Sequence, residues 1–412
     1  MNDSLNGKIK DCIVLAGPDL EPRECQAFEY ESGIITRMDL GQPASTPVGA
    51  KQVIIPGLVN GHTHVGDAFL ADVATNMTLA EAFFRPNGFK YRALSQISPD
   101  DHVAHMTEFL RGMASSGTIA HFDFREQGVE GCHRLRKAST DSGVRSIILS
   151  QLNHSPFSES ELSEATLPLP ESTRAEITKL LEVADGFSES TMNDLTDHGW
   201  VEIREMAKAA GKTCAVHCLE DASYRATSIK RTGRGDLERA IELLDPDLII
   251  HLTVANDDEI ELLAKSGIPA VINPRANASL GLPLPPIARL LRAGVPLLIG
   301  TDNGILNGPN LFAEMDFTYR LARSQAGTND PVQPLEILRM TTSNLKKTRW
   351  RDELPGQLAI GLPATFAIVD FSTPWLATSR NLHAALVTRV TPADIQRTVR
   401  SGRTIYSSSP ST

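Results

Sequence analysis

The chain has 412 residues, of which 41% are hydrophobic, and a formal net charge of −10. This length exceeds that of most domains with a single core, but it suits a barrel of about 250 to 300 residues with an added module. The acidic balance disfavours a nucleic-acid-binding surface, which is normally basic, and favours a small-molecule substrate as the partner.

Apolar, β-rich runs alternate with longer helical segments through most of the chain, which is typical of βα units around a parallel sheet. Eight runs are predicted as strands: 58–64, 118–124, 145–151, 181–186, 213–217, 248–251, 270–273 and 297–301. Helices are predicted between them, among others over 101–115, 195–210, 237–244 and 257–266. Gly211 and Gly267 are well placed as helix C-caps. Eight such units predict an α/β fold of the (β/α)8 TIM-barrel type, in which the C-terminal ends of all strands meet at one rim.

Both ends of the chain differ from this pattern. Residues 8–56 contain closely spaced turn signals, and residues 356–407 contain strand-like runs such as Ala364–Phe371. Neither region has helical periodicity. The flanks therefore predict β-rich structure outside the barrel.

Side chains that can bind a divalent metal stand at the ends of four predicted strands. The run Val53–Gly61 leads into His62-Thr63-His64. Residues two apart in a strand point to the same face, so both imidazoles can reach one ion. A lone histidine at a strand end is more often a hydrogen-bonded structural residue. His217, His251 and Asp302 repeat the placement, however, and this donor set predicts a zinc or iron site at the rim.

With these ligands, the chain resembles the amidohydrolase superfamily. The barrel of that family carries His-x-His on its first strand, single histidines on strands five and six, and an aspartate on strand eight. The segments that resemble its cytosine-deaminase and chlorohydrolase branch, particularly the adenosyl-compound deaminases, are His251–Ala255, Asn273–Gly281 and Gly300–Gly304. The resemblance runs from about residue 50 to the C-terminus. It implies a hydrolase barrel over residues 57–357 and a small composite β-sandwich built from residues 1–56 and 358–412.

The resemblance also implies the cofactor, a divalent metal ion. Zinc is expected, with iron or manganese as alternatives. Many members of the family hold two metals bridged by a carbamylated lysine at the end of strand four. No lysine follows the apolar run in Leu181–Ser190, which favours one ion. Glu189 is kept as an alternative bridge to a second ion.

The implied catalytic residues are Glu220, Asp302 and His251. A divalent ion lowers the pKa of bound water from about 15.7 toward about 7, so water becomes the nucleophile. Asp302 can bind the ion and also orient this water. Glu220 lies three residues after His217 and matches the branch's His-x-x-Glu, in which the glutamate shuttles protons. The alternative for Glu220 is a solvated loop carboxylate beside Asp221.

Four residues near the rim are predicted to contact the substrate. Arg125 can hold a carboxylate, phosphate or carbonyl group, or form an internal salt bridge with Asp123. His154 stands where related deaminases place a histidine beside the leaving group or sugar, with a capping role as the alternative. Asn273 and Arg275 lie where the seventh strand meets the rim.

The segment Phe83–Arg92 follows the first strand and is both aromatic and basic. It is predicted either as a lid over an acidic or heteroaromatic ligand or as a solvated loop docked through its Phe residues. The site and the resemblance favour a metal-dependent aminohydrolase that deaminates a heterocyclic base or a nucleoside-like small molecule. The alternatives are a cyclic amide hydrolase of the imidazolonepropionase kind and a non-catalytic superfamily scaffold. Assembly as a homo-oligomer is left open.

Location is predicted from the N-terminus and from the length of the apolar stretches. The first residues lack the apolar core of a signal peptide, and no stretch approaches the roughly 18 apolar residues of a membrane helix. Five cysteines without Cys-x-x-Cys spacing disfavour a disulfide framework and a four-thiolate zinc site. We therefore expect a cytoplasmic protein that has no membrane partner.

Overall fold

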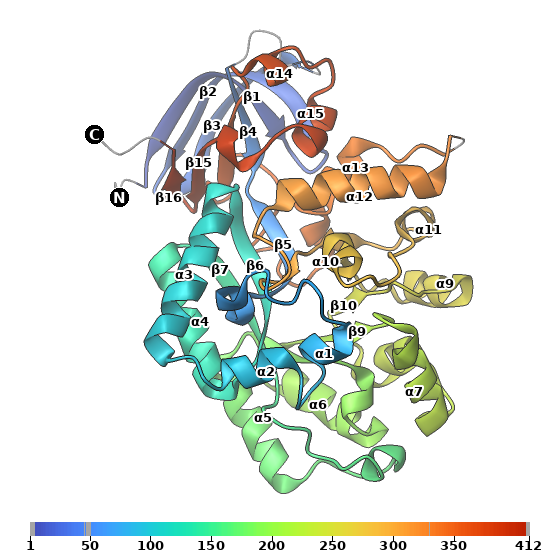
Figure 1. Ribbon diagram of the computed structural model, residues 1–412. Helices are drawn as coiled ribbons and strands as arrows, with labels where there is room; N and C mark the ends of the chain where they lie inside the picture. Colours follow the sequence, from blue (N-terminus) through green and yellow to red (C-terminus); the bar gives the residue numbers. More distant parts are fainter. Residues whose placement is uncertain (1–4, 45, 47–50, 329, 409–412) are drawn as a thin grey trace.

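The computed structural model describes residues 5–44, 46, 51–328 and 330–408. The first four residues, on which part of the signal-peptide prediction rests, lie outside this range. The chain forms two sheets, one from its middle and one from its two ends (Figure 1). None of the helices in the described residues has the length and apolar character needed to span a bilayer.

The middle of the chain forms a parallel sheet that closes on itself. Its strands are β5 (Leu58–His64), β6 (Thr118–Arg125), β7 (Arg145–Ser150), β8 (Gly186–Glu189), β9 (Thr213–Cys218), β10 (Leu248–His251), β11 (Ala270–Ile272), β12 (Leu297–Ile299) and β13 (Asp302–Asn303). β12 and β13 are two parts of one eighth strand, because β12 pairs with β11 and β13 pairs with β5. The predicted eight-stranded barrel is confirmed.

Gly300 and Thr301, between β12 and β13, allow the eighth strand to pack closely against the first. The Asn60 side chain donates to Thr301 Oγ1 at 2.8 Å and accepts from the Thr301 backbone N–H at 3.1 Å. A Cβ at Gly300 would lie 2.7 Å from the His62 Cβ and would also clash with Asn273 Oδ1. Glycine at this position therefore lets the eighth strand approach the first at the level of the metal-ligand candidates.

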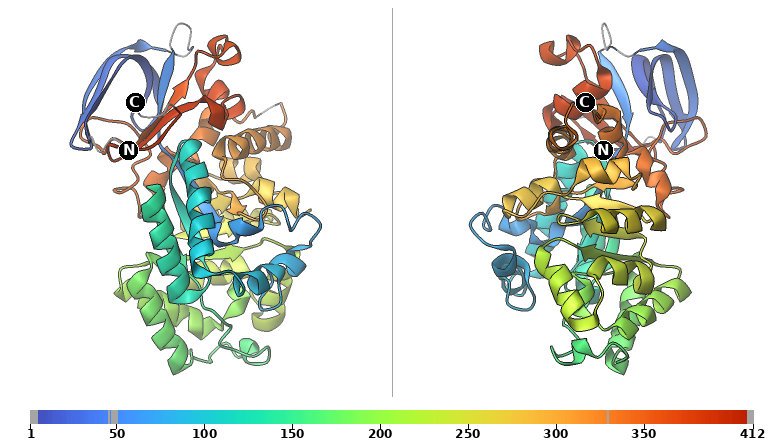
Figure 2. Two further views of the ribbon diagram at one scale, coloured as in Figure 1. Left: turned by 60° about the vertical axis from the view of Figure 1, so that its left-hand side comes forward. Right: turned by 90° about the vertical axis from the view of Figure 1, so that its right-hand side faces the viewer.

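Helices cover the outside of the barrel (Figures 1 and 2). The longer ones are α3 (Pro99–Ser115), α4 (Gly128–Ser142), α5 (Glu171–Val183), α6 (Asp197–Ala209), α7 (Ala222–Thr232), α9 (Asp257–Ser266) and α12 (Leu311–Ala326). Shorter helices are α1 (Leu79–Phe83), α2 (Phe89–Leu94), α8 (Asp236–Arg239), α10 (Pro274–Ser279), α11 (Ile287–Arg292), α13 (Pro334–Arg339), α14 (Pro374–Ala377) and α15 (Leu382–Thr388). Local signals set their bounds: α9 begins in a capping box of Asn256 and Glu259 and ends at Gly267, whose φ is 71°.

The predicted bounds of the fourth barrel strand are wrong. The prediction places it over 181–186, whereas α5 continues to Val183 and β8 covers Gly186–Glu189. Ile177, Leu180 and Leu181 are all buried on α5, at the i, i+3 and i+4 positions of one helical face. A short apolar run does not distinguish the last turn of a buried helix from a strand.

The two ends of the chain combine into one mixed sheet. Its strands are β1 (Gly7–Ala16), β2 (Glu21–Glu31), β3 (Ile34–Pro43), β4 (Gln52–Pro56), β14 (Phe366–Asp370), β15 (Ile395–Arg400) and β16 (Arg403–Ser407), in the order β16-β15-β14-β4-β1-β2-β3. Phe28 on β2 and Phe366 on β14 meet edge to face with ring centroids 5.2 Å apart, although β4 and β1 stand between their strands in the sheet. The sheet therefore curls around a core of its own, which agrees with the predicted β-rich module from both termini.

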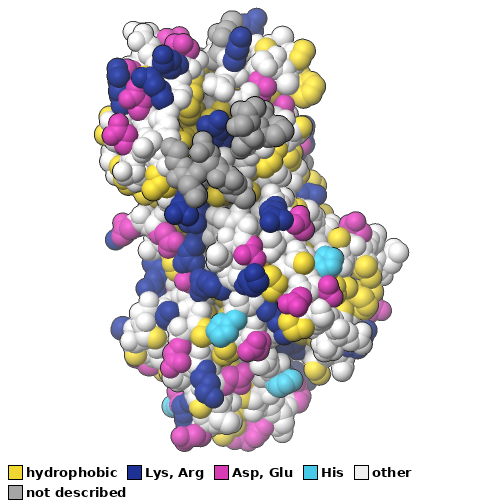
Figure 3. All heavy atoms as spheres, turned by 90° about the vertical axis from the view of Figure 1, so that its left-hand side faces the viewer, with side chains coloured by type: hydrophobic (Ala, Val, Ile, Leu, Met, Phe, Trp, Pro, Cys, Tyr) yellow, Lys and Arg dark blue, Asp and Glu magenta, His cyan; other side chains and the backbone are white. Residues whose placement is uncertain are grey.

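Charges of both signs are interspersed on the face that carries α3, α4 and β16 (Figure 3). Arg145, at the start of β7, lies 3.0 Å from Asp185 and 2.6 Å from Glu353. These ion pairs lie at the N-terminal ends of the barrel strands, the face that serves stability rather than catalysis in this architecture.

Candidate active site

The five predicted metal ligands converge at the C-terminal rim of the barrel. They form two overlapping groups, His62, His64 and His217, and His62, His251 and Asp302, in each of which the donor atoms lie within 4.8 Å of one another. All five side chains are buried. His62 Nε2 lies 3.1 Å from Asp302 Oδ1, and the His217 and His251 rings stack with centroids 5.2 Å apart. The structure thus brings the five predicted ligands together, and their binding of a metal ion stays a prediction.

The backbone is held in an unusual conformation at two of these residues. His251 has a φ of 82° and Asp302 a φ of 64°, in the left-handed region that non-glycine residues rarely adopt. Such conformations cost on the order of 1–3 kcal/mol each and persist where the surrounding structure imposes them. At these strand ends they aim both side chains toward the ligand cluster.

Neighbouring groups orient the imidazoles so that their Nε2 atoms face the cluster. His64 Nδ1 lies 2.8 Å from Glu126 Oε1, and His217 Nδ1–H donates to the backbone carbonyl of Glu189 at 3.0 Å. A carboxylate or carbonyl on one ring nitrogen is the usual support of a metal-binding histidine, because it fixes the tautomer and leaves the other nitrogen for the ion.

The protonation states of the cluster also fit a divalent cation. Burial lowers the pKa of His62 to about 3 and holds the pKa of His217 well below its usual value, so both imidazoles are neutral at pH 7. Burial alone would raise the pKa of Asp302, but the hydrogen bond with His62 and the nearby imidazoles lower it, so this carboxylate is ionised. Neutral imidazoles and a carboxylate are the donor forms that zinc requires.

Glu220 lies in the loop after β9, beside the ligand cluster. Its Oε1 is 3.6 Å from His251 Nε2, and its Oε2 accepts a hydrogen bond from the Tyr224 hydroxyl at 2.8 Å. The side chain is buried, and burial raises its pKa. The alternative of a solvated loop carboxylate is therefore wrong. A buried carboxyl group with a raised pKa is suited to taking up and giving back a proton.

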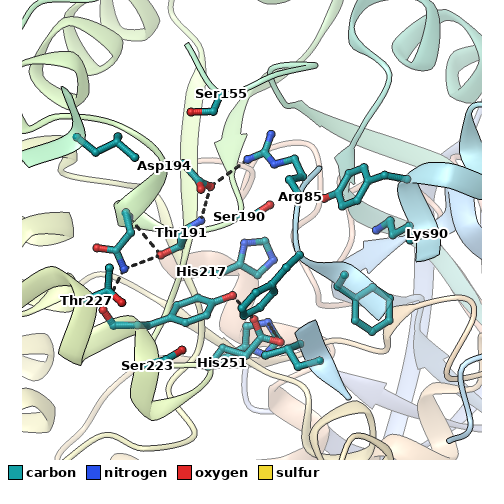
Figure 4. Close-up of a pocket in the computed structure, with 18 of the residues that line it drawn as sticks. Arg85, Lys90, Ser155, Ser190, Thr191, Asp194, His217, Ser223, Thr227 and His251 are labelled. Carbon is teal, nitrogen blue, oxygen red and sulfur yellow. Dashed lines mark hydrogen bonds and ion pairs between the residues drawn. The ribbon is translucent and has the colours of Figure 1, made fainter. Parts of the chain in front are cut away.

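A cavity of about 440 Å³ opens onto the cluster. Its inner wall includes Glu220 and four of the five ligand candidates, all but His62. The segment 79–91 forms another wall through Leu79, Phe83, Phe84, Arg85, Lys90 and Tyr91. Figure 4 shows Arg85 and Lys90 on the side of the cavity opposite Ser223 and Thr227. The segment thus forms one wall of the cavity, and we call residues 79–94, with α1 and α2, the lid.

Arg125 requires a correction, because it does not reach the cavity. Phe124 packs inside the barrel against His62, with ring centroids 4.4 Å apart, so the alternation of β6 turns Arg125 to the opposite face. There the guanidinium lies 3.4 Å from Asp123 Oδ1 and pairs with Glu126. The internal salt bridge, which was the alternative, is the arrangement observed.

The other three predicted substrate contacts also lie outside the cavity lining. His154 is exposed on the loop after β7, and Arg275 pairs with Glu314 at 3.2 Å. Asn273 is buried with its Nδ2 3.3 Å from His251 Nδ1, and Asn277 Nδ2 lies at the same distance. The two amides therefore border a ligand candidate rather than the substrate space, and these three expectations are corrected as well.

Arg85 and Tyr224 line the cavity, unlike the four predicted substrate contacts. Arg85 of the lid donates to the Leu152 carbonyl at 3.0 Å and to Asp194 at 2.9 Å, and it also pairs with Glu189. Tyr224 was missed, although its position four residues after Glu220 is a signal that the two side chains can meet at the start of a helix.

The Glu189 carboxylate is engaged away from the ligand cluster. Its Oε2 pairs with Arg85, and its Oε1 accepts the Leu152 N–H at 3.0 Å. Glu189 contributes its backbone carbonyl to His217 instead. This arrangement offers no free carboxylate at the position considered for a second ion.

Known proteins resemble the chain over most of its length. The model of the Amidohydrolase family matches residues 53–405. A protein of Methanothermobacter thermautotrophicus, which its name assigns only provisionally as an aminohydrolase, is 32% identical over 364 residues, covering 88% of this chain and 91% of that protein. A 5-methylthioadenosine/S-adenosylhomocysteine deaminase of Thermoanaerobacter pseudethanolicus is 24% identical over 369 residues, covering 87% and 82%. The crystal structure of an adenosine deaminase from Xanthomonas campestris with bound zinc aligns with a TM-score of 0.79 at 21% identity, covering 96% and 92%. This chain therefore belongs to the amidohydrolase family.

Proposed function

We propose that the protein is a metal-dependent aminohydrolase that deaminates a heterocyclic base or a nucleoside-like small molecule. The observation that carries this proposal is the place of Glu220. It is a buried carboxyl group that lines the cavity beside the ligand cluster, with one oxygen held by Tyr224 and the other 3.6 Å from His251. Hydrolytic deamination needs a group that moves protons from water to the ring and to the departing amine, and Glu220 stands where such a group is needed.

His62, His64, His217, His251 and Asp302 would hold the metal, with zinc as the proposed ion and iron or manganese as alternatives. The zinc in the adenosine deaminase structure supports this choice. When bound, such an ion lowers the pKa of water from about 15.7 toward about 7 and so supplies hydroxide near neutral pH.

The remaining steps belong to side chains of this chain. Asp302 accepts a hydrogen bond from the attacking water and orients its lone pair toward the amino-bearing ring carbon. Glu220 takes a proton from the water at Oε1 and delivers it to the adjacent ring nitrogen. It then carries the second proton to the amine, which leaves as ammonia. Tyr224 keeps the Glu220 carboxyl group in place by donating to Oε2.

The cavity walls support a flat ring with polar substituents. Phe83, Phe84, Tyr91, Phe157 and Tyr224 supply aromatic surface on which a planar heterocycle can stack. Hydroxyl and amide groups also line the cavity, at Ser155, Ser190, Thr191 and Asn193. A base that carries a hydroxylated or similarly polar group matches this mixture of aromatic and polar walls.

The proposal is tested by ammonia release from a panel of amino-substituted heterocycles and nucleosides. We expect at least one compound to release one ammonia per molecule, with the ultraviolet change of an amino-to-oxo conversion. Ring opening without ammonia would indicate the cyclic amide hydrolase instead. Absence of turnover across the panel, with metal bound, would favour the non-catalytic scaffold.

We also predict about one tightly held divalent ion per chain. Five donor side chains converge on one place, and the Glu189 carboxylate is taken by Arg85 and Leu152. Elemental analysis of protein purified without added metal measures this ratio. Removal of the ion by a chelator should abolish ammonia release, and added zinc should restore it. A reproducible value near two would contradict the one-metal site.

A cytoplasmic location and the absence of a membrane partner stay predictions from the sequence. Assembly into a homo-oligomer likewise stays open to measurement, by light scattering of the purified protein.

A further inference from the structure

The lid carries a buried lysine that contacts residues directly after the first two barrel strands. Lys90 on α2 is only 2% exposed, and its ammonium group pairs with Glu126 Oε1 and lies 3.3 Å from Asp67 Oδ2. The Phe83 ring of α1 lies 5.8 Å from the same nitrogen. A buried ammonium group is costly without such partners, so these contacts tie the lid to the barrel.

The first partner, Glu126, also supports a metal-ligand candidate. Its Oε1, the atom that pairs with Lys90, lies 2.8 Å from His64 Nδ1. Its Oε2 pairs with Arg125. One carboxylate oxygen is therefore shared between the lid and the first strand of the barrel.

The second partner, Asp67, contacts the residues that follow the ligand candidate Asp302. Asp67 lies in the short 3-10 helix η1 (Val65–Leu70), directly after His64. Its Oδ2 accepts a hydrogen bond from Asn303 Nδ2 at 2.7 Å, and its Oδ1 accepts the Ile305 N–H at 3.1 Å. Asn303 follows Asp302 in the chain. Lys90 thus contacts the supports of both β5 and β13, the two strands that close the barrel.

We propose that Lys90 is a positioning residue that couples closure of the lid to the metal centre. The inference rests on the proposed metal site. An ion held by His64 would leave its Nδ1–H to donate to Glu126 Oε1, the same oxygen that pairs with Lys90. Coupling between two equilibria is reciprocal, so a closed lid must in turn favour metal retention.

The charges around Lys90 favour the same coupling between the lid and the metal centre. Within the described residues, the buried carboxylates of Asp67, Asp123 and Glu126 are paired with Arg125 and Lys90. Opening the lid withdraws Lys90 and leaves Arg125 as the cation in contact with this group. Glu126 and Asp67 then lose a fixed partner, and the strand ends that carry His64 and Asp302 lose a common anchor.

The test measures hydrogen exchange of the lid with and without zinc, using no substrate. In the wild type we expect zinc to slow amide exchange in α2 by about fivefold or more, the lower end of typical coupling effects. Lys90→Met should lose most of this zinc effect and should release zinc to a chelator correspondingly faster. Arg92→Met is the matched control, because Arg92 is an exposed cation on the same helix whose guanidinium contacts the Asn87 carbonyl. It should behave as the wild type.

A conservative variant separates positioning from folding. Lys90→Arg keeps the charge and should recover the zinc effect on the lid, whereas Lys90→Met should not. If Lys90→Met fails to accumulate as folded protein, Lys90→Gln carries the same comparison. Equal zinc effects in the wild type and Lys90→Met, or no zinc effect on α2 in the wild type, would overturn the inference. Because ammonia release is not part of the readout, such a result with ammonia release intact leaves the proposed function standing.

Discussion

Replacing Glu220 by Gln is expected to lower the turnover number by about a hundredfold or more while the metal content stays at the wild-type level. The substitution keeps the size of the side chain and an oxygen that can accept a hydrogen bond from the Tyr224 hydroxyl. It removes the carboxyl group that exchanges protons. Glu220 is also not part of either close donor group, so its loss should not release the ion. Steady-state ammonia release and elemental analysis of the same preparation measure both effects.

Glu159→Gln provides the control for Glu220→Gln. Glu159 lines the same cavity, but its side chain is 83% exposed and pairs with Arg231 rather than approaching the ligand cluster. We expect this variant to keep near-wild-type turnover. If Glu220→Gln lost its metal, Glu220 would be a ligand, and its assignment as a proton carrier would be wrong.

The ligand cluster could be predicted from the sequence because its geometry follows from two periodic rules. Residues two apart in a strand share a face, which places His62 beside His64. The C-terminal ends of parallel strands meet at one rim, which brings His217, His251 and Asp302 to the same place. Neither rule depends on details of packing, so residues 240 positions apart could be placed together, as the 3.1 Å between His62 and Asp302 shows.

The substrate wall could not be predicted in the same way, because it depends on which face of a strand turns inward. His121, Asp123 and Arg125 alternate with Phe122 and Phe124, and either set has the spacing of an inner face. Packing of Phe124 against His62 decides the question, and this contact joins two strands. The sequence therefore predicts the alternation but not which of the two sets faces the barrel interior.

The lid illustrates a different limit. Its aromatic and basic composition indicated a ligand-covering segment, and Phe83, Arg85 and Lys90 do line the cavity. The partners of these side chains come from distant parts of the chain, such as Glu189 for Arg85 and Glu126 for Lys90. Composition alone cannot predict which carboxylate pairs with each basic side chain, because the barrel fold brings these carboxylates close to the lid.

Replacing Arg125 by Met should lower the free energy of unfolding by about 3–5 kcal/mol, the usual cost of removing one partner from a buried ion pair. The variant leaves Asp123 and Glu126 buried without the guanidinium between them. Urea unfolding followed by circular dichroism measures the change. Arg136→Met is the control, because Arg136 is 43% exposed and pairs with Asp185 at 3.4 Å, so its loss should cost about 1 kcal/mol or less.

The kinetic behaviour of Arg125→Met distinguishes the two roles considered for this residue. An internal ion pair predicts lower stability with a Michaelis constant near the wild-type value, because Arg125 lies on the outer face of β6 and does not line the cavity. A substrate contact predicts the reverse, a raised Michaelis constant for anionic substrates at unchanged stability. Measuring both quantities on one preparation decides between them. The second pattern would require Arg125 to leave Asp123 and Glu126 and turn toward the cavity.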